Sequence, residues 1–118
     1  MPPAPARGEV WFVDLDPVRG HEQGRQRPAL VISADLFNEG PAGLVIILPL
    51  TTRDRRIPTH VRIDPPEGGV TRRSFVKVED IRSISVERLS KRWGRVKPAT
   101  LASIEEILVI LLGLEASS

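Results

Sequence analysis

Residues 28–33, with the sequence PALVIS, and residues 44–50, with the sequence LVIILPL, are the two apolar runs that decide the fold. Both are short and rich in branched aliphatic side chains, as buried strands are. The loop between them contains Gly40, Pro41 and Gly43, which break any helix and allow the chain to turn back. We therefore expect the two runs to pair as antiparallel neighbours within a sheet.

A polar residue stands at the outer end of each run, Arg27 before the first and Thr51 after the second. In an antiparallel pair the start of one strand lies beside the end of the other, so these residues should meet at one rim. A guanidinium and a hydroxyl on rigid strand ends can bind a phosphate through several directed donors. The alternative is structural: Arg27 forms a salt bridge with Glu22 or Asp35, and Thr51 caps a turn.

More short strands and one helix are expected around this pair. Alternating apolar residues predict strands at 9–15, 60–64, 74–78, 81–84 and 92–96, with helical turns at 35–38 and 86–89. Residues 98–113 predict an amphipathic helix, with Pro98 in its first turn and Gly113 at its end. The fold class is therefore mainly β with a C-terminal α-helix, built as a small, curved sheet or barrel.

The C-terminal helix carries more apolar surface than one small sheet can cover. Two adjacent stripes run along it, the first with Leu101, Ile104, Leu108 and Leu111 and the second with Ile107, Ile110 and Leu114. Monomers rarely expose an apolar band of this kind. We therefore expect a homodimer in which part of this helix faces a second copy.

Length and composition limit the possible classes of protein. The 118 residues fit a single domain, which we place at 7–114, with flexible ends at 1–6 and 115–118. The chain has no cysteine and only two histidines, which argues against a disulfide framework, a thiolate nucleophile, a metal site or a cofactor. The longest apolar run, 104–114, is too short to cross a bilayer, so we expect no membrane association and a cytoplasmic location.

The charge is unevenly distributed although the net charge is only +2. Residues 53–97 contain 13 Lys or Arg against 6 Asp or Glu, whereas the remainder contains 4 against 9. A polyanionic partner should therefore approach the middle of the chain. A solvated basic surface without a partner is the plain alternative.

Several ordered motifs together resemble the MazF/PemK family of toxin–antitoxin ribonucleases. They are RGEVW (7–11), LDP (15–17), GHEQG (20–24), RPALVIS (27–33), PTHV (58–61) and EDIRSI (79–84). The similarity runs from about Arg7 to Leu114. It implies an SH3-like small β-barrel, as in MazF, PemK and CcdB toxins, that dimerises and is neutralised by a cognate MazE-like antitoxin. We expect that antitoxin to be acidic and to bind over the RNA groove.

The resemblance also implies an activity and a set of site residues. The activity is metal-independent cleavage of single-stranded RNA at a short sequence, leaving a 2′,3′-cyclic phosphate and a 5′-hydroxyl. The family's catalytic arginine and threonine would fall on Arg27 and Thr51. Hydrogen-bonding residues of the loop and strand segments that would line the RNA groove are His21, Glu22, Gln23, Arg25, His60, Arg72, Ser74, Glu79, Asp80 and Arg82.

Three residues depart from the family pattern within these RNA-lining segments. His21 replaces a frequent serine, Arg73 an aspartate and Asp80 a glutamine. Because the catalytic pair is intact, these departures bear on the cleavage sequence. Two other functions remain open: a CcdB-like poison of DNA gyrase on the same scaffold, and a non-catalytic RNA-binding barrel.

Individual residue roles also remain open at this point. An arginine is a poor acid and a poor base, so the groups that carry the protons do not follow from the residues. His21 and His60 are candidate acid and base, although a histidine alternating on a wet strand face is usually a surface residue. Trp11 and Trp93 fit the core better than a base-stacking site.

Overall fold

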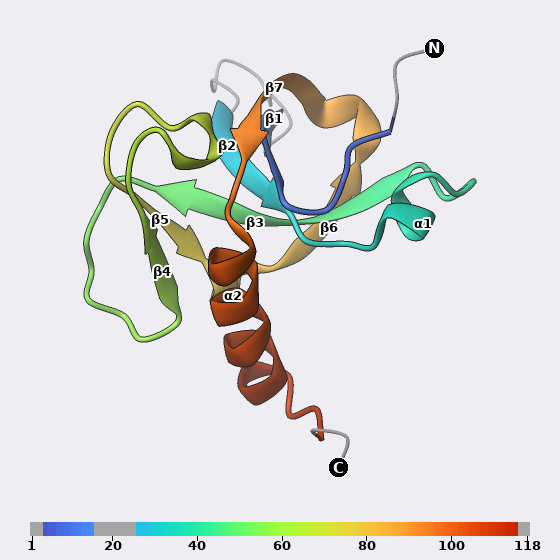
Figure 1. Ribbon diagram of the computed structural model, residues 1–118. Helices are drawn as coiled ribbons and strands as arrows, with labels where there is room; N and C mark the ends of the chain where they lie inside the picture. Colours follow the sequence, from blue (N-terminus) through green and yellow to red (C-terminus); the bar gives the residue numbers. More distant parts are fainter. Residues whose placement is uncertain (1–3, 16–25, 116–118) are drawn as a thin grey trace, which may run out of the picture.

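The molecule is built on a strongly bent antiparallel sheet (Figure 1). The computed structural model describes residues 4–15 and 26–115. The strands are β1 (Glu9–Asp14), β2 (Gln26–Val31), β3 (Leu44–Thr51), β4 (His60–Ile63), β5 (Ser74–Lys77), β6 (Arg82–Ser85) and β7 (Leu89–Arg95). Their order is β4-β5-β3-β2-β1-β7, with β6 also paired to β3. The expected mainly β class with a C-terminal helix is confirmed.

The helical segments are short except for the last. They are α1 (Asp35–Asn38), the 3-10 turns η1 (Glu67–Gly69), η2 (Val78–Asp80) and η3 (Val86–Arg88), and α2 (Pro98–Leu111). Helix α2 starts beside the sheet, and its C-terminal end projects away from the body (Figure 1). Within the described residues no helix has the length and apolar character needed to span a membrane.

The two apolar runs pair as expected. Strands β2 and β3 are antiparallel, with Ala29 opposite Pro49, Leu30 opposite Leu48 and Val31 opposite Ile47. The first strand ends at Val31 rather than at Ser33. The backbone N–H groups of Ile32 and Ser33 both donate to the Ile46 carbonyl, at 2.9 and 3.4 Å, so the regular ladder stops there.

Pro49 marks the point at which β3 changes its second neighbour. Residues 44–47 of β3 pair with β6, whereas Leu50 and Thr51 pair with β5. Proline has no N–H to donate, and it is tolerated in a sheet only where a ladder hydrogen bond is not required. The proline therefore fits the junction between the two neighbours.

Strands β2 and β3 are buried on both faces. One core cluster contains Leu30, Leu48 and Leu50 with Ile104 of α2, and the other contains Ala29, Val31, Val45 and Ile47. Successive residues of a strand point to opposite faces, so this alternation places the strand pair between two apolar layers. That burial fixes the position of both strand ends.

Other element boundaries differ from the sequence-based expectation by a few residues. Strand β7 begins at Leu89 rather than residue 92, and β6 begins at Arg82 rather than residue 81. Helix α2 ends at Leu111, two residues before Gly113, whose φ of +67° continues the turn out of the helix. In the N-terminal segment, Pro5 is buried and its carbonyl accepts a hydrogen bond from the Asn38 side-chain amide.

The sheet is barrel-like rather than a closed barrel. Among the described residues, β4 and β7 are the two ends of the strand order and do not pair with each other. The turn η1 packs onto β7 instead, with Gly69 against Trp93. The expected SH3-like barrel is therefore an approximate description of the sheet.

This contact yields a stability prediction with a matched control. Gly69 and Gly43 both have positive φ values, +75° and +67°, so alanine is strained at either position. A Cβ on Gly69 would lie 2.1 Å from the Trp93 carbonyl oxygen, whereas nothing lies within 4 Å of one on Gly43. We expect Gly43→Ala to lower the free energy of unfolding by about 1–2 kcal/mol, and Gly69→Ala by roughly 4 kcal/mol or more.

Urea unfolding followed by circular dichroism measures both variants. Equal losses of stability in the two would show that η1 can move away from β7 at little cost.

Candidate functional site

A cavity of about 600 Å³ lies at the rim where β2 begins and β3 ends, and Arg27 and Thr51 both line it. Extending the β2–β3 register by two residues from Ala29 opposite Pro49 brings Arg27 opposite Thr51. The expected meeting of the two side chains at one rim therefore follows from the core pairing. The full lining, here called the Arg27–Thr51 cavity, is Arg27, Pro28, Leu50, Thr51, Thr52, Arg53, Arg55, Ser74 and Lys77.

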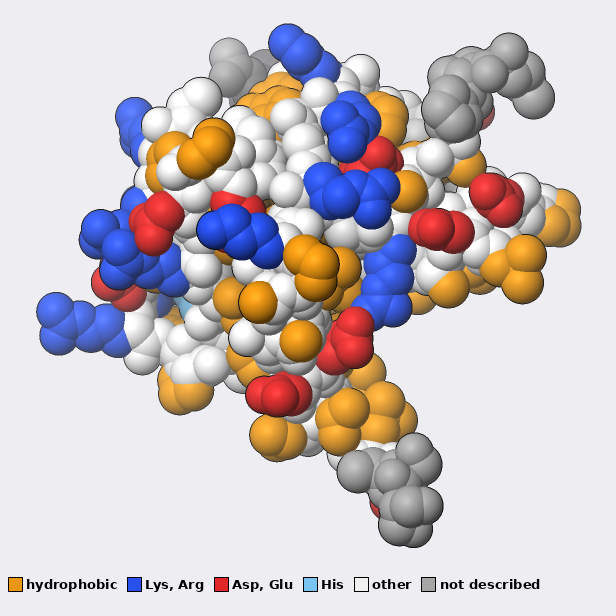
Figure 2. Space-filling view, in the orientation of Figure 1, with side chains coloured by type: hydrophobic (Ala, Val, Ile, Leu, Met, Phe, Trp, Pro, Cys, Tyr) orange, Lys and Arg blue, Asp and Glu red, His pale blue; other side chains and the backbone are white. Residues whose placement is uncertain are grey.

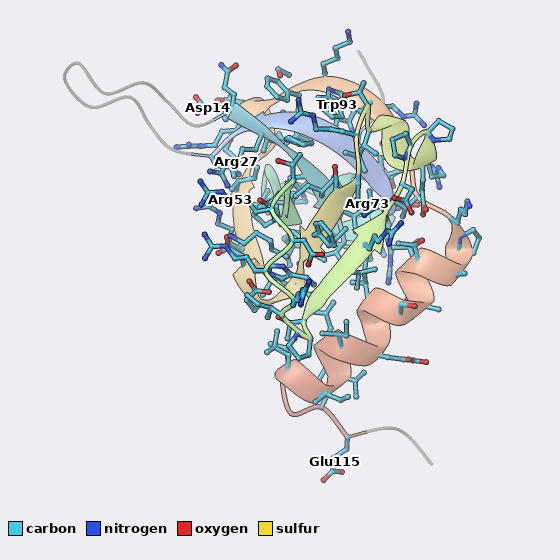
Figure 3. All side chains as sticks on the ribbon, turned by 90° about the vertical axis from the view of Figure 1, so that its left-hand side faces the viewer. Asp14, Arg27, Arg53, Arg73, Trp93 and Glu115 are labelled. Carbon is cyan, nitrogen blue, oxygen red and sulfur yellow. The ribbon has the colours of Figure 1, made fainter. Side chains whose placement is uncertain are left out.

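The lining of the cavity is strongly cationic. Four of these side chains, Arg27, Arg53, Arg55 and Lys77, carry positive charge, and no carboxylate from the described residues lines the cavity. Figure 3 shows Arg27 and Arg53 close together on this side of the molecule. Hydroxyl groups of Thr51, Thr52 and Ser74 stand among the cations. The cavity therefore favours a polyanion that offers several oxygen acceptors.

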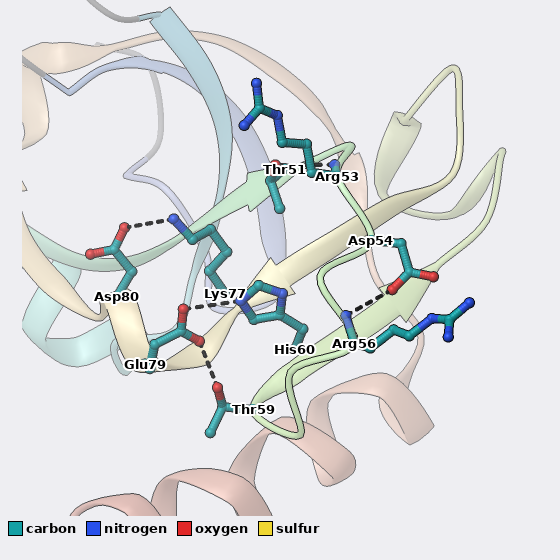
Figure 4. Close-up of polar contacts among 9 residues, drawn as sticks. All are labelled: Thr51, Arg53, Asp54, Arg56, Thr59, His60, Lys77, Glu79 and Asp80. Atoms are coloured by element: carbon teal, nitrogen blue, oxygen red, sulfur yellow. Dashed lines mark hydrogen bonds and ion pairs between the residues drawn. The ribbon is translucent and has the colours of Figure 1, made fainter.

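The loop after β3 is shaped by two local hydrogen bonds (Figure 4). The Thr51 Oγ1 accepts from the Arg53 backbone N–H at 3.2 Å, and the Asp54 Oδ1 accepts from the Arg56 N–H at 3.0 Å. Arg56 has a φ of +52°, which turns the chain sharply. With the Thr51 oxygen accepting from the backbone, its O–H remains able to donate to a ligand.

Ser74 is the third of the sequence-predicted residues that line the cavity. It opens β5, is 4% exposed, and its hydroxyl donates to the Arg72 carbonyl at 2.9 Å. That bond uses the only hydrogen of the hydroxyl, so toward a ligand the Ser74 oxygen can act only as an acceptor. Arg72 itself is exposed and is not among the lining residues.

His60 lies outside the cavity, and the expectation that it stands on a wet strand face is wrong. Its side chain is 3% exposed, and its Nε2 lies 3.0 Å from Glu79 Oε2. The other carboxylate oxygen of Glu79 accepts from the Thr59 hydroxyl at 2.7 Å. The β4–β5 register places His60 directly opposite Lys77, the last residue of β5. The turn η2 follows Lys77 at once, and it brings the Glu79 carboxylate to the imidazole of His60 (Figure 4).

The pKa of Glu79 shows how this contact is balanced. Partial burial opposes ionisation of the carboxyl group, but hydrogen bonds from Thr59 and His60 outweigh it, so the pKa of Glu79 lies below its ordinary value. Glu79 is therefore a carboxylate at neutral pH, and each of its two oxygens already has a hydrogen-bond partner, Thr59 or His60. Its observed contacts hold η2 onto β4.

The other sequence-predicted residues are distributed around the cavity rather than in it. Asp80 Oδ2 lies 3.4 Å from the Lys77 ammonium, and Arg82 is half-buried on β6 opposite Ile47. The Arg82 Nε is buried without a hydrogen-bond partner among the described residues. The predicted loop residues His21, Glu22, Gln23 and Arg25 lie outside the residues that the structure describes.

Three charged lining residues were absent from the predicted site, Arg53, Arg55 and Lys77, as were the uncharged Pro28, Leu50 and Thr52. The basic loop directly after Thr51 was the available signal for the two arginines, since a loop that leaves a site rim carries its side chains to that rim. Lys77 had a weaker signal. It is the only charge in the apolar strand 74–78, and Asp80 follows three residues later.

Trp11 and Trp93 do not line the cavity, in agreement with their assignment to the core. Trp93 packs against the first core cluster and Trp11 against the second. Within residues 4–15 and 26–115, no three His, Cys, Asp or Glu side chains come together as a metal site would require.

Sequence comparison finds one protein family for nearly the whole chain. The family of PemK-like, MazF-like toxins of type II toxin–antitoxin systems matches residues 6–112. The chain is 39% identical over 113 residues to the endoribonuclease MazF9 of Mycobacterium tuberculosis, covering 92% of this chain and 96% of that protein. It is 38% identical over 109 residues to the endoribonuclease EndoA of Bacillus subtilis, covering 92% and 94%.

Solved structures give the same result. A MazE–MazF complex from Deinococcus radiodurans is similar with a TM-score of 0.81 and 32% identity, over 95% of this chain and 98% of that one. An endoribonuclease from a mycobacterial species, solved with its cognate antitoxin, has a TM-score of 0.78 and 32% identity, over 97% and 100%.

Proposed function

The chain belongs to the PemK/MazF family of type II toxins, and we propose that it is an endoribonuclease toxin that cleaves single-stranded RNA in the Arg27–Thr51 cavity. The observation that carries the proposal is the juxtaposition of Arg27 and Thr51 in a cationic cavity with no acidic lining among the described residues. A gyrase poison that acts by binding a protein has no need for such a phosphate-binding pair. The relatives named as endoribonucleases favour the nuclease as well.

The proposed chemistry uses the RNA's own 2′-hydroxyl as nucleophile. Its oxygen forms a bond to the adjacent phosphorus as it loses its proton, and the bond from phosphorus to the 5′-oxygen breaks as that oxygen gains a proton. The products are a 2′,3′-cyclic phosphate and a 5′-hydroxyl. Negative charge accumulates on the non-bridging oxygens in between, and Arg27 supplies the opposing positive charge.

Thr51 has a positioning and stabilising role in this proposal. Its hydroxyl donates to a non-bridging oxygen, while its own oxygen is held by the Arg53 N–H at 3.2 Å. A phosphate held at two points is fixed in orientation, which favours in-line departure of the 5′-oxygen. The resemblance to the family further implies that Arg27 takes part in proton transfer.

Substitution at the two residues tests the assignment. We expect Arg27→Ala and Thr51→Val each to lower kcat/KM by at least about 100-fold, as loss of a transition-state donor does. Thr51→Ser retains the hydroxyl and should keep most of the activity. Cleavage should persist in excess EDTA, and the products should carry 5′-hydroxyl ends.

The measurement is end analysis of a long RNA by enzymatic labelling, with thermal melts of each variant as the folding control. Products with 5′-phosphate ends that form only with magnesium would refute this chemistry. Binding of RNA without any cleavage would favour the non-catalytic RNA-binding barrel.

We further propose a homodimer through α2. Leu101, Ile107 and Leu108 pack against the first core cluster, so part of the second stripe is covered within the chain. Ile110, Leu111, Leu112 and Leu114 are 81%, 41%, 52% and 56% exposed. Figure 2 shows hydrophobic side chains gathered on this projecting end of the helix. A contiguous apolar surface of this kind supports association of two copies.

Light scattering at micromolar concentration should report a dimer. Ile110→Glu places a charge in the apolar surface and should give a monomer, whereas Ala102→Glu, on an exposed part of the same helix, should remain dimeric. A wild-type monomer would contradict the proposal.

A cognate antitoxin is the proposed protein partner, since similar toxins are solved in complex with one. We propose that an acidic, partly disordered segment of it binds over the RNA cavity, because the four cations there attract any flexible polyanion. RNA and antitoxin then compete for one surface.

Competition binding with Thr51→Val protein measures this directly. An RNA made non-cleavable by a 2′-deoxyribose at the cleavage position and the antitoxin should displace each other, and added salt should slow association of both. Simultaneous binding without mutual weakening would place the antitoxin elsewhere.

A further inference from the structure

Lys77 lines the cavity but has no role in the chemistry proposed for Arg27 and Thr51. It is the last residue of β5 and lines the Arg27–Thr51 cavity. Strand β5 pairs with β3 so that Phe75 lies opposite Thr51. Residues two apart on a strand point to the same face, so Lys77 and Thr51 share a face, separated along the strand by two residues, or about 7 Å.

The surroundings of Lys77 hold it in the cavity. His60 on β4 lies directly opposite Lys77, and its side chain is buried beneath Glu79. The Glu79 carboxylate forms hydrogen bonds with Thr59 and His60. The turn η2 follows Lys77 at once and returns Asp80 to it, with 3.4 Å between the ammonium and the carboxylate (Figure 4). The Lys77 side chain is 25% exposed, so most of its surface is covered by its neighbours.

The ion pair with Asp80 uses little of the capacity of Lys77. An ammonium has three donors, and the single contact of 3.4 Å is longer than a strong charge-assisted hydrogen bond. Asp80 is 48% exposed, so water screens the pair and its contribution is small. Donors of Lys77 therefore remain for an anion that enters the cavity.

We propose that Lys77 is a substrate-contact residue that binds the RNA phosphate next to the one held by Arg27 and Thr51. The inference rests on the proposed ribonuclease function. A separation of about 7 Å along the strand matches one step to a neighbouring phosphate better than a second contact to the same one. Because the contact is to a phosphate, it strengthens binding of every RNA sequence alike.

The salt dependence of RNA binding distinguishes this role from a structural one. Each phosphate neutralised on a single strand contributes about −0.7 to the slope of log K against log salt concentration. Lys77→Met removes the charge and keeps the length of the side chain, so the slope should become shallower by about 0.7. Lys77→Arg should keep the wild-type slope, and Lys91→Met on β7, outside the cavity, is the matched control.

The cleavage position is first mapped on a long RNA with the wild-type protein. A fluorescent oligonucleotide spanning that position, with a 2′-deoxyribose at the cleaved nucleotide, is then titrated with each variant between low and moderate salt. We expect Lys77→Met to lose affinity at low salt and to approach the wild type as salt rises, with Lys91→Met unchanged throughout.

Each outcome separates the two proposals. If the wild type cleaves and Lys77→Met shows an unchanged slope, including a uniform loss of affinity at all salt concentrations, Lys77 is structural and only this inference fails. This inference alone also fails if the slope becomes shallower in Lys77→Arg as much as in Lys77→Met. The same conclusion holds if Lys91→Met changes the slope by as much as Lys77→Met does. If the wild type neither cleaves nor binds RNA, the proposed function and this inference fail together.

Discussion

The antiparallel pairing of β2 with β3 is the constraint on which the rest of the structure depends. Both strands are buried on both faces, between one apolar cluster that includes Ile104 of α2 and another that includes Ile84 of β6. A slip of one residue would exchange the side chains facing these two clusters. It would also move Arg27 away from Thr51, so the apolar packing that specifies the register also specifies the proposed site.

Among the described residues no carboxylate lines the cavity, and those around it pair mostly with cations outside it; the exception is Asp80, which lies 3.4 Å from the Lys77 ammonium. Asp64 lies 3.1 Å from Arg62 and 3.3 Å from Arg73, and Glu79 lies 3.0 Å from His60. Asp64 and Glu79 therefore link β4, β5 and η2. The positive charge inside the cavity is consequently available to a ligand, although the net charge of the chain is small.

The sequence was sufficient for the features that depend on local pattern. Alternation and turn residues predicted the paired strands, and the positions of Arg27 and Thr51 at their ends followed from antiparallel geometry. The burial of His60 could not be predicted in this way, because it depends on which residue of β5 lies opposite it and on η2 folding back. Lys77 was missed for the same reason: only the β4–β5–β3 register brings it to the rim where β2 begins.

The composition of the cavity limits what it can recognise. Its charged groups, Arg27, Arg53, Arg55 and Lys77, are suited to phosphates, and phosphate contacts orient a nucleic acid without reading its sequence. Selection of bases requires hydrogen-bonding groups that meet their edges. Among the described residues that line the cavity, Thr51, Thr52 and Ser74 offer such neutral groups, and Ser74 already donates to the Arg72 carbonyl. We therefore propose that the choice of a cleavage sequence also depends on residues beyond these, and Glu22 and Gln23, with their hydrogen-bonding side chains, are the sequence's strongest candidates.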